Sequence, residues 1–206
     1  MRLLLVRHGE SGHHRLGLVS GRDSCPGLTS AGREQAAALR DRLAALGTRA
    51  DVVLWSTVAR ARETAEILLP AFGEVAVAGE DCDLCEIHIG EGDGLTTGEF
   101  AARYGTFDPL AEPARPLSPG GETWQEFTAR VDASLSGLAR RYPGKTVVAV
   151  THAGYVVWAF MRLFGVPRPG TGARLDPGFT SVTEWRWDAG GGYWTMGSYN
   201  DLTHLA

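Results

Sequence analysis

The stretch Leu3-Leu4-Leu5-Val6-Arg7-His8-Gly9-Glu10-Ser11 decides the fold of this 206-residue chain. Four apolar residues that run into a polar pair and a glycine are typical of a short buried strand and its carboxyl end. Ligands of open α/β sheets bind at that edge. There the imidazole of His8 can attack an electrophile, while the guanidinium of Arg7 holds phosphate oxygens through paired hydrogen bonds. An ordinary polar strand end would look the same, so the rest of the chain must decide.

A second apolar run repeats this design. Thr146–Val150 leads into Thr151-His152-Ala153-Gly154. Parallel strands end at the same edge of a sheet, so His8 and His152 are expected to be neighbours. Either histidine alone is as consistent with a structural cap as with catalysis, but the coincidence favours function. Arg60 follows another predicted strand at the start of a helix, where free backbone N–H groups also favour an anion.

Apolar periodicity alternates between strand and helix along the chain, which predicts an α/β fold. We expect a three-layer α/β/α sandwich around a mostly parallel central sheet. Strands are predicted at 3–6, 52–55, 146–150, 181–187 and 193–199 with a short one between 73 and 119, and helices between Thr29 and Gly47, from Val58 to Pro70, at 96–104, at 124–138 and after Gly154. His13–Gly27 is predicted to be a Gly-rich loop. Residues 1–206 are expected to form one domain, with a small cap at about 87–121.

The composition argues against several classes of protein. A hydrophobic content of 44% with 21% charged residues is ordinary for a soluble globular chain. The net charge of −4 argues against a general nucleic-acid binder, which would carry a basic stripe. Apolar runs fall short of the roughly 20 residues of a membrane span, so a cytoplasmic protein without membrane contact is expected. Cys82 and Cys85 have CxxC spacing, but no strand-to-helix pattern of the redox type follows, which favours a structural or incidental role.

Segments along nearly the whole chain resemble the histidine phosphatase superfamily, which includes cofactor-dependent phosphoglycerate mutases. The first and last are Arg7–Ser11 and Thr151–Gly154, each carrying one of the two histidines. Between them lie Gly21–Thr29 with Gly32–Ala36, Val58–Glu66, Leu84–Ile87 with Gly90 and Gly92, and Pro119–Thr123 with Phe127, Arg130 and Val131. A single match would be weak evidence, whereas this ordered series is specific.

The resemblance implies a two-step phosphoryl transfer. His8 would attack phosphorus in line and form a phosphohistidine that water later hydrolyses. Arg7, Arg60 and His152 would clamp the phosphoryl oxygens, and the two guanidinium charges should keep His8 neutral. Glu86 would protonate the leaving oxygen and then activate water. By itself Glu86 belongs to an acidic stretch that could be a solvated loop, and only the matched segment singles it out. No metal or other cofactor is implied.

Further contacts to the phosphate are expected from residues beside these five. They are Ser11, His14, Ser20, Gly21 and Ala153. His14 departs from the family, which commonly has an asparagine there. His13 precedes it, and His8, His13, His14 and His152 could in principle hold a metal, although no carboxylate or cysteine spacing supports such a site.

Three functions stay open, and a phosphatase is favoured. A mutase must shield its phosphohistidine from water, but only about 35 residues separate Glu86 from Glu122, which leaves a short cap. An inactive phosphate-binding regulatory module is disfavoured because the proposed nucleophile, acid and arginines are all present.

The substrate stays open too. A sugar phosphate, a nucleotide or a phosphorylated biosynthetic intermediate would fit the predicted walls of the pocket. Ser20-Gly21 also resembles the α-ribazole phosphatase branch. A homodimer is plausible from the resemblance. Phe100, Tyr104 and Phe107 are expected in the core rather than against substrate.

Overall fold

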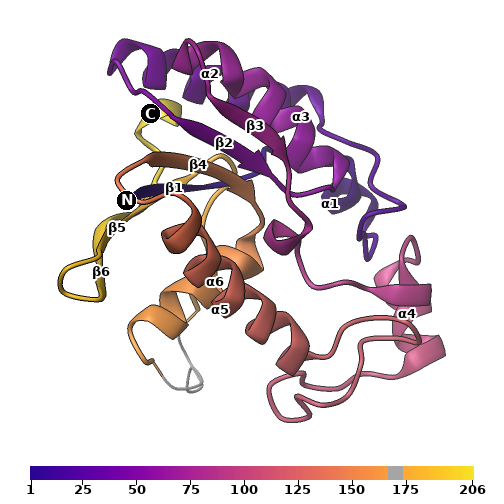
Figure 1. The fold of residues 1–206 in the computed structure, drawn as a ribbon. Coiled ribbons are helices and arrows are strands. Elements are labelled where there is room, and N and C mark those ends of the chain that lie inside the picture. The colour runs from indigo at the N-terminus through magenta and orange to yellow at the C-terminus, as the bar shows by residue number, and fades with distance from the viewer. Residues whose placement is uncertain (167–173) are drawn as a thin grey trace.

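The computed structural model describes residues 1–166 and 174–206 (Figure 1). The strands are β1 (Arg2–Arg7), β2 (Val52–Trp55), β3 (Val77–Glu80), β4 (Thr146–Thr151), β5 (Val182–Asp188) and β6 (Tyr193–Asp201). The α-helices are α1 (Gly12–Leu16), α2 (Ser30–Ala45), α3 (Ala59–Leu68), α4 (Thr97–Tyr104), α5 (Trp124–Arg141) and α6 (Ala153–Leu163). Short 3₁₀ helices span Leu69–Phe72, Cys82–Leu84, Gly90–Gly92 and Thr203–Leu205. Among the described residues, no helix is both long and apolar enough to span a membrane.

The strands form one mixed sheet in the order β3-β2-β4-β1-β5-β6. β3, β2, β4 and β1 are mutually parallel, and β1 pairs with β4 in a register that sets Arg7 opposite Thr151. β5 and β6 are antiparallel, as the short Gly-rich connection between them requires. The predicted α/β fold with a mostly parallel sheet is therefore confirmed.

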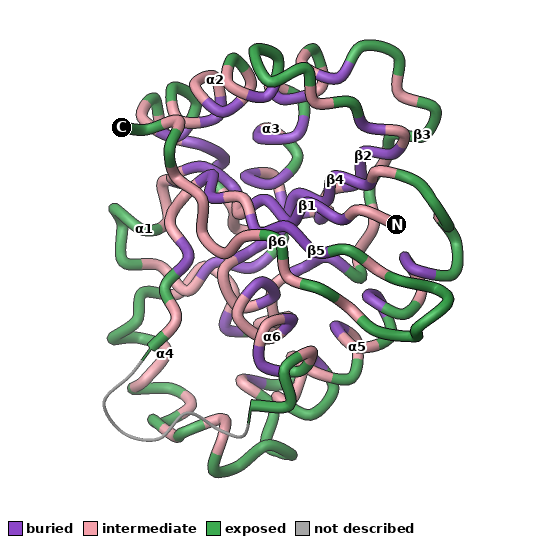
Figure 2. The backbone as a smooth tube through the Cα atoms, turned by 90° about the vertical axis from the view of Figure 1, so that its left-hand side faces the viewer, coloured by how far each residue is buried: buried purple, intermediate pink, exposed green. Residues whose placement is uncertain are grey.

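Helices cover both faces of this sheet, as Figure 2 shows, with α2 and α3 on one side and α5 and α6 on the other. Successive side chains of a strand point to opposite faces. Leu4 and Val6 pack under α2 and α3, whereas Leu3 and Leu5 pack under α5 and α6. A strand buried on both faces needs a continuous apolar run, which is why β1 and β4 were recognisable in the sequence.

Three local predictions differ from the structure. The predicted loop His13–Gly27 contains α1, which buries none of its residues and so lacks apolar periodicity. Pro70 lies within the 3₁₀ helix Leu69–Phe72, and α3 ends earlier, at Leu68. Phe100, Tyr104 and Phe107 are only half-buried and lie outside both core clusters, so the prediction that they are core residues is wrong.

Two glycines allow the backbone that follows β1 to lie directly against the first turn of α2. A Cβ at Gly32 would overlap the carbonyl oxygen of Glu10, and one at Gly9 would overlap the carbonyl oxygen of Gly32. Thr29 caps α2 by accepting a hydrogen bond from Gly32 N, and its own N–H donates to Glu10 O. This close backbone contact holds Gly9 and Glu10, the two residues that follow His8, against the start of α2.

We expect Gly32→Ala to lower the free energy of unfolding by about 1–3 kcal/mol, because the new methyl group can be accommodated only if the backbone shifts. Gly137→Ala is the matched control. Gly137 lies inside α5, where a Cβ meets only open space and the end of Arg141, so alanine should stabilise the helix by about 0.5–1 kcal/mol. Urea unfolding measures both, and a Gly32→Ala protein as stable as the wild type would contradict the contact.

Candidate active site

Three adjacent parallel strands deliver the predicted phosphate-binding side chains to one edge of the sheet. His8 directly follows β1, His152 follows β4, and Arg60 lies in the first turn of α3, just after β2. The His8 N–H donates to Thr151 O at 2.9 Å, which continues the β1–β4 pairing past the strand ends. The ring centroids of His8 and His152 are 5.1 Å apart, so the two histidines are neighbours as predicted.

Two hydrogen bonds determine which nitrogen of His8 is free to react. Nδ1 lies 2.7 Å from Gly9 O, and a carbonyl can only accept, so Nδ1 carries the proton. Arg60 Nε donates to His8 Nε2 at 3.1 Å, which requires a lone pair on that nitrogen. His8 is therefore held as the tautomer whose Nε2 lone pair faces the arginine.

Burial and positive charge both keep the two histidines neutral. Burial lowers the pKa of His8 well below its ordinary value, and Arg60, His152 and Arg7 lower it further, while the Gly9 carbonyl opposes them. The pKa of His152 is likewise well below its ordinary value, because of burial first and then Arg60. The neutral form of the His8 imidazole is thus present at neutral pH.

His152 and Arg7 each have a buried nitrogen without a hydrogen-bond partner among the described residues. These are His152 Nδ1 and Arg7 Nε. The other ring nitrogen of His152 lies 2.8 Å from Ser56 Oγ, whereas Arg7 donates through Nη1 to the Pro177 carbonyl and stacks 4.1 Å from the Phe179 ring centre. A buried polar group without a partner is costly, so an anion bound here would relieve that cost.

Glu86 reaches this site from the segment after the 3₁₀ helix Cys82–Leu84. Its carboxylate accepts a hydrogen bond from Gly154 N at 2.9 Å, in the first turn of α6. A Cβ at Gly154 would overlap that carboxylate, so the glycine leaves space for Glu86 in this conformation. His152, the residue before α6, and Glu86 therefore share one helix N-terminus, where the dipole favours a negative charge.

The ion pair of Arg130 and Glu122 holds the Glu86 segment in place. Arg130 on α5 donates to both Glu122 carboxylate oxygens, from Nε at 2.8 Å and from Nη2 at 2.7 Å. It also donates to the main-chain carbonyls of Cys85 (2.9 Å) and Glu86 (3.1 Å). Both residues belong to a segment that resembles the family, but the sequence does not reveal this role, because nothing in the local pattern shows which main-chain carbonyls an arginine will reach.

The additional predicted contacts lie around the same centre. The Ser11 hydroxyl donates to Gly27 O at 2.8 Å, the His14 ring is exposed with its centroid 6.1 Å from that of His8, and Ala153 opens α6. Ser20 accepts from Arg60 Nη1 through its main-chain oxygen, while Gly21 N donates to Asp93. Their roles in phosphate binding stay predictions.

His13, to which the sequence assigns no role in phosphate binding, also lies close to His8. Its ring centroid is 6.4 Å from that of His8 and 3.8 Å from that of His14. Burial, Arg60, His14 and Arg7, in that order, lower the pKa of His13 to about 3. The four histidines do not bring their nitrogens close enough for a metal. Within the described ranges, one group of side chains does bring its possible metal-ligand atoms together, and it consists of Cys82, Cys85 and His88.

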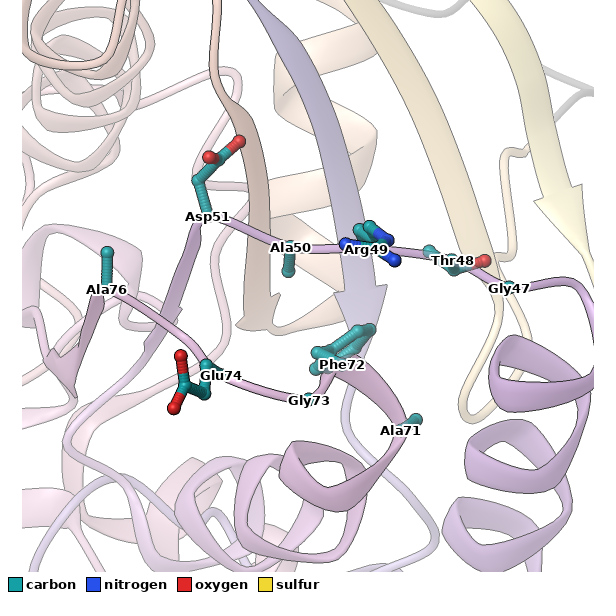
Figure 3. A pocket seen from close by; sticks show the side chains of 10 residues that line it. All are labelled: Gly47, Thr48, Arg49, Ala50, Asp51, Ala71, Phe72, Gly73, Glu74 and Ala76. Carbon is teal, nitrogen blue, oxygen red and sulfur yellow. The ribbon is translucent and has the colours of Figure 1, made fainter.

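Two hollows differ in their relation to this site. The larger, of about 630 Å³, lies at the opposite edge of the sheet, between Gly47–Asp51 and Ala71–Ala76 (Figure 3), and contains none of the predicted site residues. The smaller, of about 280 Å³, borders the Gly21 loop and the Glu86 segment. It is lined by Arg22, Asp23, His88, Ile89, Gly90, Asp93 and Gly120. Its lining also contains none of the predicted site residues, but Arg22 follows Gly21 in the chain, His88 lies two residues after Glu86, and the lining carries charges of both signs.

The His8 tautomer can be tested directly. At pH 6.5 an ordinary histidine is half protonated, but we expect the His8 ring to carry a single proton, on Nδ1, because burial and Arg60 lower its pKa. Long-range ¹H–¹⁵N correlation spectra of the imidazoles report this state. Arg60→Met should raise the pKa of His8 by removing a positive charge. An imidazolium at pH 6.5 in the wild type would contradict the assignment.

We expect Arg130→Ala to lower the free energy of unfolding by about 3–5 kcal/mol, because it removes the guanidinium that pairs with the half-buried Glu122 carboxylate. Catalytic turnover should fall as well, since the Glu86 segment loses its support. Arg141→Ala is the matched control on the same helix. Its ion pair with Asp81 is exposed and contributes at most about 1 kcal/mol. Equal losses in the two variants, measured by urea unfolding, would refute the role of Arg130.

The chain is similar to several proteins of known sequence or structure. The chain is 27% identical to the metal-independent phosphoserine phosphatase of Arabidopsis thaliana over 99% of its own length and 83% of that protein. It is 31% identical to the adenosylcobalamin/alpha-ribazole phosphatase of Escherichia coli K12 over 81% of each. The solved structure of Bacillus stearothermophilus YhfR superposes with a TM-score of 0.82 at 28% identity, covering 100% of this chain and 99% of that one. The family model of the histidine phosphatase superfamily (branch 1) matches residues 3–202, and the chain belongs to that superfamily.

Proposed function

We propose that this chain hydrolyses a small-molecule phosphate monoester through a phosphohistidine at His8. Family membership and the phosphatase relatives support a phosphoric monoester hydrolase. The observation that carries the proposal is the His8 ring. Gly9 O fixes its proton on Nδ1, and its Nε2 lone pair faces the guanidinium of Arg60.

In the first step, a bond forms from His8 Nε2 to phosphorus as the bond to the ester oxygen breaks. Arg60 Nε turns from the histidine to a phosphoryl oxygen, because the lone pair that it contacts is consumed. Arg7 Nε and His152 Nδ1, which lack partners among the described residues, bind phosphoryl oxygens too. The carboxyl group of Glu86 donates its proton to the leaving oxygen.

In the second step, Glu86 is a carboxylate and takes a proton from water. That water attacks phosphorus on the side that the alcohol has left, and the N–P bond breaks. The electron pair returns to His8 Nε2, and phosphate departs. The hydrogen bond from Gly154 N positions the Glu86 carboxylate between the two steps.

The remainder of the substrate is proposed to lie toward the smaller hollow, beneath a cap formed by about 87–121. The start of α4 contacts the loop after α1. Thr97 N donates to Gly17 O, and Leu18 and Thr96 form an isolated antiparallel β-bridge. Charges of both signs, from Arg22, Asp23 and Asp93, border the hollow and suit a polar substrate. The names of the two relatives make phosphoserine and α-ribazole phosphate the first esters to assay.

The central experiment measures hydrolysis of p-nitrophenyl phosphate and of these two esters by wild type and His8→Ala. We expect the variant to lose at least about 10³-fold in kcat, because it lacks the nucleophile. Rapid denaturation of the wild type during turnover should trap an acid-labile phosphoenzyme that the variant does not form. Undiminished hydrolysis by His8→Ala would refute the mechanism, and isomerisation of phosphoglycerate without hydrolysis would favour a mutase.

Glu86→Gln tests the acid in the same assay, with Glu91→Gln as the control. Both residues belong to the acidic stretch that the sequence alone did not resolve, but Glu91 is exposed. The loss in Glu86→Gln should be larger for alkyl phosphates than for p-nitrophenyl phosphate, whose leaving group needs little protonation. Equal activity of the two variants on alkyl phosphates would remove Glu86 from the proposed role.

A further inference from the structure

Two thiols and an imidazole converge beside the catalytic residues but take no part in the proposed reaction. Cys82 Sγ lies 3.6 Å from Cys85 Sγ and 3.7 Å from His88 Nε2. The three ligand atoms all lie within 4.8 Å of one another. The 3₁₀ helix Cys82–Leu84 produces this arrangement, because residues three apart in such a turn face the same side.

The spacing matches the edges of a tetrahedral zinc site. Zinc binds thiolate sulfur at about 2.3 Å and imidazole nitrogen at about 2.0–2.1 Å, which sets tetrahedral S–S and S–N edges near about 3.8 and 3.6 Å. The distances from Cys82 Sγ to the other two ligand atoms already lie within a few tenths of an ångström of these values. A cation could therefore be accommodated between the three atoms with small side-chain shifts.

The surroundings orient the imidazole as a metal ligand requires. His88 Nδ1 lies 3.6 Å from Glu122 Oε2, so the ring turns its other nitrogen toward Cys82. Metal-bound histidines commonly pair their second nitrogen with a carboxylate in this way. Thr57 Oγ1 lies 3.2 Å from Cys85 Sγ and 4.0 Å from Cys82 Sγ, where an oxygen could complete the coordination.

Access and charge also fit a cation site. Cys85 is buried at the base of the cluster, whereas Cys82 and His88 are partly exposed, which leaves a route from the surface. Ligation by two thiolates releases whatever protons the thiols carry and leaves a neutral Zn(thiolate)₂ unit. Thiolate and imidazole ligands select soft or borderline cations over Mg²⁺ or Ca²⁺.

We propose that Cys82, Cys85 and His88 form a binding site for a thiophilic divalent cation of the Zn²⁺ class, with water or the Thr57 hydroxyl as the fourth ligand. The cation is not part of phosphoryl transfer. It would cross-link Cys82–His88, the segment that carries Glu86 and that Arg130 holds from the other side. The bound cation would thus stabilise the position of this segment and take no part in the reaction.

The test titrates the reduced full-length protein with Zn²⁺ against a chromophoric chelator and repeats the titration with Co²⁺. We expect one equivalent to bind, with thiolate-to-cobalt charge-transfer absorption and the intense visible bands of tetrahedral cobalt. Cys82→Ser and His88→Ala should abolish this spectrum. Glu122→Gln should weaken zinc binding by about 10- to 100-fold, as loss of an outer carboxylate does elsewhere.

Cys25→Ser is the matched control, because Cys25 is the third free cysteine and lies apart from the cluster, near Ser11. It should bind zinc as the wild type does. Cobalt absorption without thiolate charge transfer would show that the cation binds away from the two cysteines and would overturn the proposal. So would rapid closure of a Cys82–Cys85 disulfide by mild oxidant in a reduced protein that binds no zinc, which would identify a redox pair.

Discussion

The parallel pairing of β1 with β4 is the constraint on which the site depends. Its register sets Arg7 opposite Thr151, so the next residue of each strand, His8 or His152, emerges at the same level of the sheet. Both strands are buried on both faces, and neither can slip by one residue without moving its apolar side chains to the wrong layer. The core of the protein therefore specifies the distance between the two imidazoles.

Electrostatics then follow from the same burial. The burial of two histidines beside Arg60 lowers the pKa of each histidine, because the charged imidazolium would be both desolvated and repelled. The proposed nucleophile thus needs no separate base to remove a proton. Arg60 both holds His8 Nε2 in the neutral state and stands where a phosphoryl group would arrive.

The proposed acid is anchored by a different principle. Glu86 lies in a segment without regular strand or helix, and hydrogen bonds from α5 and α6 hold it in addition to the apolar packing of Leu84 and Ile87 on either side. Arg130 binds main-chain carbonyls of that segment while Glu122 orients the guanidinium, and Gly154 leaves room for the carboxylate. The same segment carries the Cys82–Cys85–His88 cluster, so two sets of polar side chains converge on one short stretch.

The sequence by itself determined the layers of the fold and the two histidines, because continuous apolar runs that end in polar residues can be read one strand at a time. The position of Arg60, at a helix start after a predicted strand, could be read in the same way, and the resemblance to a known family added Glu86. Only the tertiary structure decided the anchoring by Arg130 and Glu122, the proximity of His13 and the formation of α1, which buries no residue and so leaves no periodic signal. The physical reason is range. Local apolar patterns encode burial within one element, whereas a polar contact between residues 44 or 45 positions apart exists only after the sheet and helices have packed.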